Sequence, residues 1–300
     1  MTLERRLRRM LSQYFAQYLL NHHLLTAQQV RELLDAESKH HVKLGVLAMS
    51  QNLMTAEQVE EVHHLQVSCD RLFGEVAIDE GYLTESQVKT LLHAQDSGNL
   101  NLGQAIIDKN IMSLPQLEKV IQDYKKNSNM ALTDALSLIE LSKIDFSEIE
   151  EVRELYTEYT DLFLRSVLRF MDTAAVVDPH AQSVPTDQKT VVVSQRLMGD
   201  VILTTGILAD ETVFLEMARR YSQEDIKEID ELAIDSVSEF LNVTNGLFLV
   251  NLSNRHLDVD LEPQKFARNE VPFGNKQAII HVNTRFGGFE LIIAADEIIF

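Results

Sequence analysis

The spacing of apolar residues divides the chain into two parts that differ in structure. Up to about residue 148, apolar residues recur three and four positions apart, which is the spacing of amphipathic helices. Beyond that point, stretches with helical spacing are mixed with β-branched runs such as TVVV at 190–193, which favour strands. We therefore expect an α+β protein, with an all-α domain over residues 1–148 and an α+β domain over residues 149–300.

The first part contains a repeat, because segments that start near residues 14, 43, 72 and 101 align at a constant spacing of 29 residues. Each segment has a short apolar stretch, a turn residue, and then Ser or Thr followed three positions later by Gln, the pattern of a capping box at a new helix start. Asn and Gly suit the turn because they tolerate the left-handed conformation, and the turn residues are His23, Asn52, Gly81 and Asn110. The capping pairs are Thr26/Gln29, Thr55/Gln58, Thr84/Gln87 and Ser113/Gln116. The pattern predicts a helical repeat array, and such arrays usually serve as scaffolds.

The second part alternates between long helices and pairs of strands. Helical spacing predicts three helices here. The first covers about Glu148–Met171, the second begins after its cap Asp210 and ends near Tyr221, and the third covers about Glu224–Val243. Strand-like runs on both sides of a turn predict three hairpins, centred on residues 198–200, 253–255 and 285–288. These elements predict a layered fold in which long helices pack on an antiparallel β-sheet.

Composition narrows the classes of function. Acidic residues outnumber basic residues by 46 to 27, a formal net charge of −19, which argues against nucleic-acid binding through a basic surface. The single cysteine, Cys69, excludes an intrachain disulfide and a cysteine-rich zinc site, and it suits the cytoplasm. No stretch of about 18 apolar residues is present, so we expect no membrane span. Adjacent histidines point about 100° apart on a helix, so we expect no metal site from the pairs at 22–23, 40–41 and 63–64.

Residues 14–124 resemble the cyclic di-GMP-binding MshEN domain, which is found at the N-terminus of type II secretion and pilus ATPases. That family has two 24-residue motifs separated by five residues. Here Lys43–Gln66 and Leu72–Gln95 are 24 residues each, with residues 67–71 between them. The resemblance implies a cyclic di-GMP site formed by Lys43, Leu44, Gly45, Gln66, Arg71, Gly74 and Gln95.

Two departures from that family bear on the ligand. Lys43 stands where the family has arginine, and Arg71 lies one place early. Arginine and lysine differ in their ability to stack on a guanine and to form paired hydrogen bonds with it. The alternative is a helical module that binds a partner. No GxxxxGK[ST] phosphate loop occurs in the chain, so it is not one of those ATPases.

The predicted helix Glu224–Val243 has one acidic face. Projected at about 100° per residue, its core side would hold Ile226, Ile229, Ala233, Val237 and Phe240. The opposite side would hold an acidic stripe that ends in an amide, made of Glu224, Glu228, Glu231, Asp235, Glu239 and Asn242. Taken alone, such a stripe is typical of a solvated helix surface.

The same helix resembles the signature of the chemotaxis phosphatases CheX, CheC and FliY, in which Asp or Ser, then Glu, Asn and a later Pro have characteristic spacing. In this chain the four positions are Asp235, Glu239, Asn242 and Pro263. The resemblance covers about residues 150–300 and has one copy of the motif, as in each CheX subunit. It implies hydrolysis of the aspartyl phosphate of a CheY-like receiver, and a homodimer formed through this domain.

In that family the receiver supplies both the phosphorylated aspartate and the magnesium ion, so the resemblance implies no cofactor of the chain's own. Asn242 would orient the attacking water, since an amide can donate and accept without placing a charge beside the phosphoryl group. Glu239 would pair with a lysine of the receiver, and Asp235 would extend the docking surface.

Phe240 and Leu241 separate the two key residues, whereas CheX has a small residue before the asparagine. Leu241 therefore either points into the core or obstructs the receiver, and obstruction would leave a protein that binds receivers without hydrolysing anything. The lead hypothesis is a CheX-like phosphatase with a regulatory repeat domain. The alternative is a non-catalytic adaptor whose repeats bind cyclic di-GMP or a partner.

Overall fold

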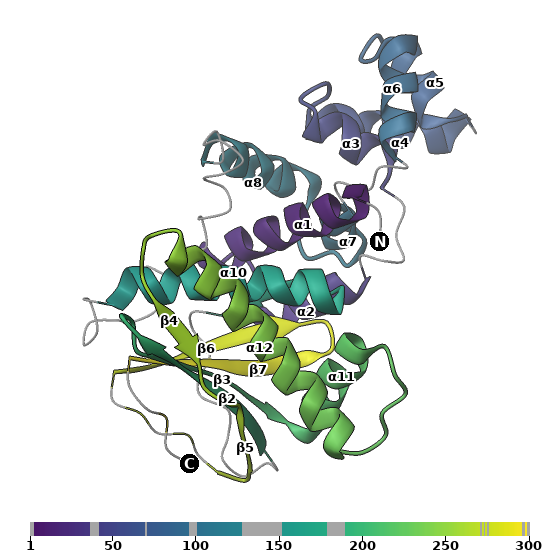
Figure 1. Cartoon of the computed structure of the whole chain (residues 1–300). Coiled ribbons are helices and arrows are strands. Elements are labelled where there is room, and N and C mark those ends of the chain that lie inside the picture. Colours follow the sequence, from purple (N-terminus) through teal and green to yellow (C-terminus); the bar gives the residue numbers. More distant parts are fainter. Residues whose placement is uncertain are drawn as a thin grey trace. The chain divides into compact units, whose positions relative to one another are not determined.

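The computed structural model in Figure 1 describes residues 3–36, 42–69, 71–95, 101–127, 152–178, 190–270, 272, 274, 276–295 and 298. The chain divides into two compact units, of which unit 1 comprises Met1–Leu19 and Gln28–Leu138, and unit 2 comprises Leu20–Ala27 and Ile139–Phe300. The domain boundary predicted near residue 148 lies outside the described residues.

The described residues up to position 127 are helical. Their helices are α1 (Leu3–Asn21), α2 (Ala27–Ala36), α3 (Leu44–Ser50), α4 (Ala56–Cys69), α5 (Phe73–Asp79), α6 (Glu85–Gln95), α7 (Asn101–Asp108) and α8 (Leu114–Asn127). The turn residues predicted from the sequence all have the left-handed conformation, with φ of 54° at His23, 56° at Asn52, 74° at Gly81 and 53° at Asn110.

Helices α4, α6 and α8 begin with the hydrogen bonds of a capping box. In α4, the Gln58 N–H donates to Thr55 Oγ1 over 3.3 Å, and the Thr55 N–H donates to Gln58 Oε1 over 2.8 Å. The same reciprocal bonds join Thr84 with Gln87, and Ser113 with Gln116. These bonds satisfy amides that a helix start leaves without a partner within the helix.

Two glycines allow close helix packing in unit 1. A Cβ atom at Gly45 would lie 2.6 Å from Val59 Cγ1, and one at Gly74 would lie 2.9 Å from Val88 Cγ1. Such distances are too short for real Cβ contacts, so a larger residue would push α3 away from α4, or α5 away from α6. Helix packing is therefore sufficient reason for glycine at both positions.

Unit 2 consists of an antiparallel sheet covered by helices, which confirms the α+β prediction for this part of the chain. The helices described in this part of the chain are α10 (Arg153–Met171), α11 (Glu211–Ser222) and α12 (Glu231–Ser253). Its strands are β1 (Ala175–Val177), β2 (Thr190–Gly199), β3 (Leu203–Asp210), β4 (Val259–Leu261), β5 (Lys265–Arg268), β6 (Gln277–Thr284) and β7 (Gly287–Ala294). The order in the sheet is β1-β6-β7-β3-β2-β4, and β5 also pairs with β2. Figure 1 shows the three helices on one face of the sheet, where a large apolar core separates the two layers.

Two of the three predicted hairpins are confirmed. Strands β2 and β3 pair from Thr190↔Asp210 to Leu197↔Leu203, and β6 and β7 pair from Gln277↔Ala294 to Thr284↔Gly287. The predicted cap of α11 is also confirmed, because Asp210 Oδ1 accepts from the Val213 N–H over 2.8 Å. The short strands β1 and β5 were not predicted.

The hairpin predicted at residues 253–255 is wrong, and so are the predicted limits of the helix before it. Helix α12 begins after Asp230, whose Oδ1 accepts from the Ala233 N–H over 2.9 Å, and it continues to Ser253. The apolar run GLFLVN at 246–251 is therefore helical. Phe248 within this run and Leu252 just after it lie one turn apart, and both are fully buried in the core. Strand β4 pairs with β2 instead, with Leu261 opposite Leu197.

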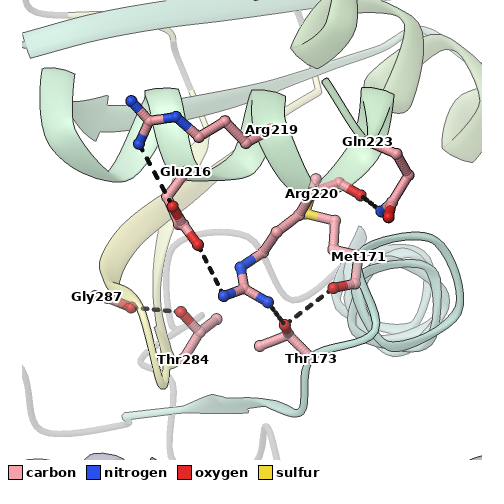
Figure 2. A network of polar contacts seen from close by, with 8 residues as sticks. All are labelled: Met171, Thr173, Glu216, Arg219, Arg220, Gln223, Thr284 and Gly287. Carbon is pink, nitrogen blue, oxygen red and sulfur yellow. Dashed lines mark hydrogen bonds and ion pairs between the residues drawn. The ribbon is translucent and has the colours of Figure 1, made fainter. Parts of the chain in front are cut away.

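The C-terminal end of α11 is tied to its neighbours by the polar contacts in Figure 2. Glu216 pairs with Arg220 over 2.7 Å and with Arg219 over 3.6 Å. Arg220 also donates to Thr173 Oγ1 over 3.2 Å, and its guanidinium lies 5.1 Å from the centre of the Phe286 ring. Arg220 therefore links the end of α11 to Thr173, in the segment that follows α10, and to Phe286.

Candidate functional site

The acidic stripe lies on α12 but is shorter than predicted. Glu224 and Glu228 precede the helix and are not part of its face. The remaining positions, with a glycine one turn further on, form what we call the α12 ridge, made of Glu231, Asp235, Glu239, Asn242 and Gly246. Steps of three and four residues place these positions on one side of a helix. Asp235 and Glu239 are exposed, and Asn242 is half-buried.

Leu241 points into the core and does not cover the ridge. Both Leu241 and Phe240 are 0% exposed and belong to the core under α12. The Phe240 ring lies 5.6 Å from the Phe163 ring and 5.8 Å from the Tyr221 ring, measured between centres. Of the two orientations that the sequence left open for Leu241, the structure has the one that points into the core, so Leu241 does not obstruct Asn242.

The Asn242 amide is held at both of its polar atoms. Its Nδ2 donates to Glu239 Oε2 over 3.2 Å, and its Oδ1 accepts from Gln195 Nε2 over 2.8 Å. Gln195 lies on β2 and is 2% exposed. An amide nitrogen has two hydrogens and an amide oxygen has two lone pairs. Among the described contacts, one hydrogen and one lone pair of Asn242 remain available.

Pro263 connects to the same amide through the residue before it. Gln195 Nε2 also donates to the backbone carbonyl of Glu262 over 2.9 Å, and the Glu262 N–H donates to the carbonyl of Arg196 over 2.9 Å. A residue before proline is restricted to extended conformations. Pro263 therefore helps to fix the direction of a carbonyl that bonds the same glutamine nitrogen as Asn242.

Tyr221 of α11 lies beside the ridge. Burial raises the pKa of its phenol, and the negative charge of Glu239 raises that pKa further. Tyr221 therefore stays protonated and neutral near Glu239.

Within the described residues, no group of three or more His, Cys, Asp or Glu side chains could hold a metal ion.

Unit 1 contains a cavity of about 680 Å³ between its helices. Of the residues that the MshEN resemblance implies for a ligand site, those that line this cavity are Lys43, Leu44, Gly45, Gln66 and Gly74. Arg71 is not among the lining residues, and its guanidinium pairs with Asp79 over 2.5 Å and with Glu75 over 3.7 Å. The side chain of Gln95 lies outside the described part of the structure.

The cavity is mainly apolar and its one lysine is already paired. Side chains such as Val46, Phe73 and Ile107 line it. Lys43 Nζ lies 3.2 Å from Asp108 Oδ1. A dinucleotide carries two phosphate charges, so its binding here would require Lys43 to exchange one anionic partner for another.

Sequence reasoning missed Gln195, Asn245 and Glu262 as neighbours of the site. Gln195 and Asn245 are buried, and Asn245 Nδ2 donates to Gln195 Oε1 over 2.8 Å. The sequence held one signal of a buried polar contact, because Asn245 is a polar residue that falls on the core side when the helix is projected. Gln195 gave no local signal, because its partner Asn242 lies 47 positions away.

No protein-family model and no curated protein matches the chain. Solved structures are similar to parts of it. The chemotaxis protein CheX from Desulfovibrio desulfuricans is 13% identical over 47% of this chain and 97% of its own, with a TM-score of 0.38. A CheX–CheY–BeF3–Mg²⁺ complex from Borrelia burgdorferi is 18% identical over 51% of this chain and 99% of the matched chain, with a TM-score of 0.37. FliY from Thermotoga maritima is 13% identical over 48% of this chain and 90% of its own, with a TM-score of 0.37.

These proteins are of the class that the motif Asp235, Glu239, Asn242 and Pro263 resembles. No comparison supports the MshEN-like resemblance of residues 14–124, which stays a prediction. None of the described helices is long and apolar enough to cross a membrane.

Proposed function

We propose that residues 150–300 hydrolyse the aspartyl phosphate of a CheY-like receiver in chemotaxis signalling. The observation that carries this proposal is the pair formed by Glu239 and Asn242, an exposed carboxylate and a half-buried amide joined by a 3.2 Å hydrogen bond on one ridge. Leu241, which could have blocked that ridge, is buried.

In the proposed reaction, Asn242 holds a water molecule in line with the phosphorus. The water attacks the phosphorus, the bond to the receiver's aspartate oxygen breaks, and inorganic phosphate and a free carboxylate result. The remaining Nδ2 hydrogen and Oδ1 lone pair of Asn242 suit this task, since positioning is the main catalytic demand of phosphoryl transfer. The magnesium ion belongs to the receiver.

Glu239 and Asp235 would dock the receiver. A carboxylate beside the amide attracts a lysine and disfavours free phosphate, which selects a basic protein surface over the bare anion. Gly246 supports close approach, because a Cβ atom there would meet nothing within 4 Å. A glycine inside a helix lowers the stability of the helix by about 1 kcal/mol relative to alanine. No neighbour within 4 Å requires the residue at position 246 to be glycine.

The test is phosphate release from a phosphorylated receiver in the presence of magnesium, with the receiver's own hydrolysis as baseline. Asn242→Ala should lower kcat by about 10²–10³-fold, the effect of losing one positioned polar group. Asn251→Ala is the matched control, because Asn251 is an exposed asparagine on the same helix. A loss of equal size in both variants, or in neither, contradicts the proposal. Receiver binding without turnover by the wild type would select the adaptor hypothesis.

A second proposal concerns unit 1, whose cavity would bind cyclic di-GMP and thereby regulate the phosphatase or a partner. Its support is the lining, which includes five of the seven residues named from the sequence, and a volume within the range of about 300–1,000 Å³ typical of ligand pockets. Calorimetry should detect binding that Lys43→Ala weakens about tenfold or more, with Lys119→Ala, an exposed lysine outside the lining, as control. No heat at tens of micromolar ligand contradicts this proposal. We also propose that the protein is located in the cytoplasm and that it forms a homodimer through residues 150–300.

A further inference from the structure

A chain of side-chain hydrogen bonds runs from the core of unit 2 to the α12 ridge. Its members come from α10, β3, α12 and β2, and we call Tyr159, Thr205, Asn245, Gln195 and Asn242 the amide relay. Tyr159 and Thr205 donate to Asn245 Oδ1 over 2.6 and 3.1 Å, and Asn245 Nδ2 donates to Gln195 Oε1 over 2.8 Å. Gln195 Nε2 then donates to Asn242 Oδ1, and Asn242 Nδ2 donates to Glu239.

The inner part of the amide relay is fully buried. Tyr159, Thr205 and Asn245 are 0% exposed, and Gln195 is 2% exposed. Burial raises the pKa of Tyr159, so its hydroxyl remains a donor. Buried polar groups destabilise a fold unless each has a partner, and a partnered group still adds little over an apolar side chain of similar size. Stability alone therefore gives a weak reason for four polar side chains in this core.

Two groups that can only accept determine the direction of every bond in the amide relay. The Glu262 backbone carbonyl faces Gln195 Nε2, and the Glu239 carboxylate faces Asn242 Nδ2. An amide side chain can turn over and exchange its oxygen and nitrogen, and its partners decide which orientation is stable. Turning over either Gln195 or Asn242 would place an oxygen against an acceptor. The Asn242 amide is therefore held in one of its two orientations.

We infer that Gln195 is a positioning residue, which fixes the orientation of the Asn242 amide so that its remaining hydrogen and lone pair point in constant directions. This inference rests on the proposed function for its catalytic meaning, but the restraint itself is a property of the protein without a receiver. Without Gln195, the Asn242 oxygen loses its donor and the amide can rotate. Docking through Glu239 remains, because that carboxylate is exposed.

One variant and one control test the inference. Gln195→Met keeps an unbranched chain of similar length and removes both hydrogen-bonding groups. Gln277→Met is the matched control, because Gln277 is a half-buried glutamine of unit 2 whose side chain, within the described residues, bonds only the backbone of Gly274 and Pro272.

The first readout is the ¹⁵N order parameter of the Asn242 side-chain amide, assigned by its disappearance in Asn242→Ala. We expect a rigid amide in the wild type and in Gln277→Met, and a value below about 0.6 in Gln195→Met. An unchanged order parameter in Gln195→Met overturns the inference. Should that variant not fold, the wild type decides, because a flexible Asn242 amide in the wild type also overturns it.

The second readout separates positioning from docking. With a phosphorylated receiver, Gln195→Met should lower kcat about 10- to 100-fold, the scale for misplacing a catalytic group, while affinity for a beryllofluoride-activated receiver changes less than twofold. An unchanged kcat in Gln195→Met, or a loss of receiver affinity as large as the loss of kcat, contradicts the inference. If the wild type does not hydrolyse the phosphoryl group but Gln195→Met loosens the amide, the proposed function fails and the positioning role stands.

Discussion

Replacing Gly246 separates the stability of α12 from its use as a contact surface. Gly246 lies inside the helix, and a Cβ atom there would meet nothing within 4 Å. Alanine should therefore gain the full difference in helix propensity, about 1 kcal/mol, without steric strain. For a unit of this size, that gain corresponds to a rise of about 2–4 °C in Tm.

Differential scanning calorimetry measures this shift. Gly287→Ala is the opposite control, because Gly287 has a φ of +142° and its Cβ would lie 2.5 Å from Val213 Cγ2, so that variant should lose stability. A lower Tm for Gly246→Ala refutes the reasoning, since it would mean that the ridge is packed against another part of the chain at this point.

Gly246→Leu then tests the ridge as a docking surface. Leucine has nearly the same helix propensity as alanine, so this variant should also be more stable than the wild type. A bulky side chain one turn from Asn242 should nevertheless weaken receiver binding about tenfold or more. Because the variant is not destabilised, misfolding cannot explain such a loss. Wild-type affinity in Gly246→Leu would exclude this end of the ridge from the interface.

Two further predictions concern stability. Leu241→Ala should destabilise unit 2 by roughly 2–5 kcal/mol in denaturant titrations, since it leaves a cavity at a fully buried position; a loss below about 0.5 kcal/mol contradicts the buried orientation. Burial raises the pKa of Asp161 from 3.8 to about 6 against the opposing charge of Arg165, so the folded state binds this proton more tightly than the unfolded state does. Stability from this group is therefore present below about pH 4 and lost as the pH rises to about 6, and Asp161→Asn should raise Tm at pH 7 and change it little at pH 4. A lower Tm for Asp161→Asn at pH 7 contradicts this sign.

Local sequence patterns predicted the parts of the fold that depend only on residues adjacent in the chain. The capping boxes of α4, α6 and α8, the left-handed turns and the hairpins around residues 198–200 and 285–288 each need only a few adjacent positions, and the structure has them. The apolar run GLFLVN was ambiguous, because its length and composition suit a strand as well as a buried helix. What decides it is the packing of Phe248 and Leu252 in the core, which is a tertiary effect.

The candidate site shows the same difference between features set by local sequence and features set by tertiary packing. Asp235, Glu239 and Asn242 share a face because helix geometry alone puts them there, and the sequence was enough to expect it. The restraint on Asn242 comes from Gln195 on a strand and from the carbonyl before Pro263, and these meet only once the sheet has formed. A motif in the sequence can therefore name the candidate catalytic groups but not the side chains that hold them in place.

The central claim is that Asn242 acts on a phosphoryl group carried by another protein. A single-turnover experiment tests it most directly, with excess chain over a phosphorylated receiver, so that all the receiver is bound and only the chemical step is followed. We expect rapid loss of the phosphoryl group with the wild type and with Asn251→Ala, and a rate close to that of the receiver alone with Asn242→Ala. Equal rates for the wild type and Asn242→Ala would contradict the account.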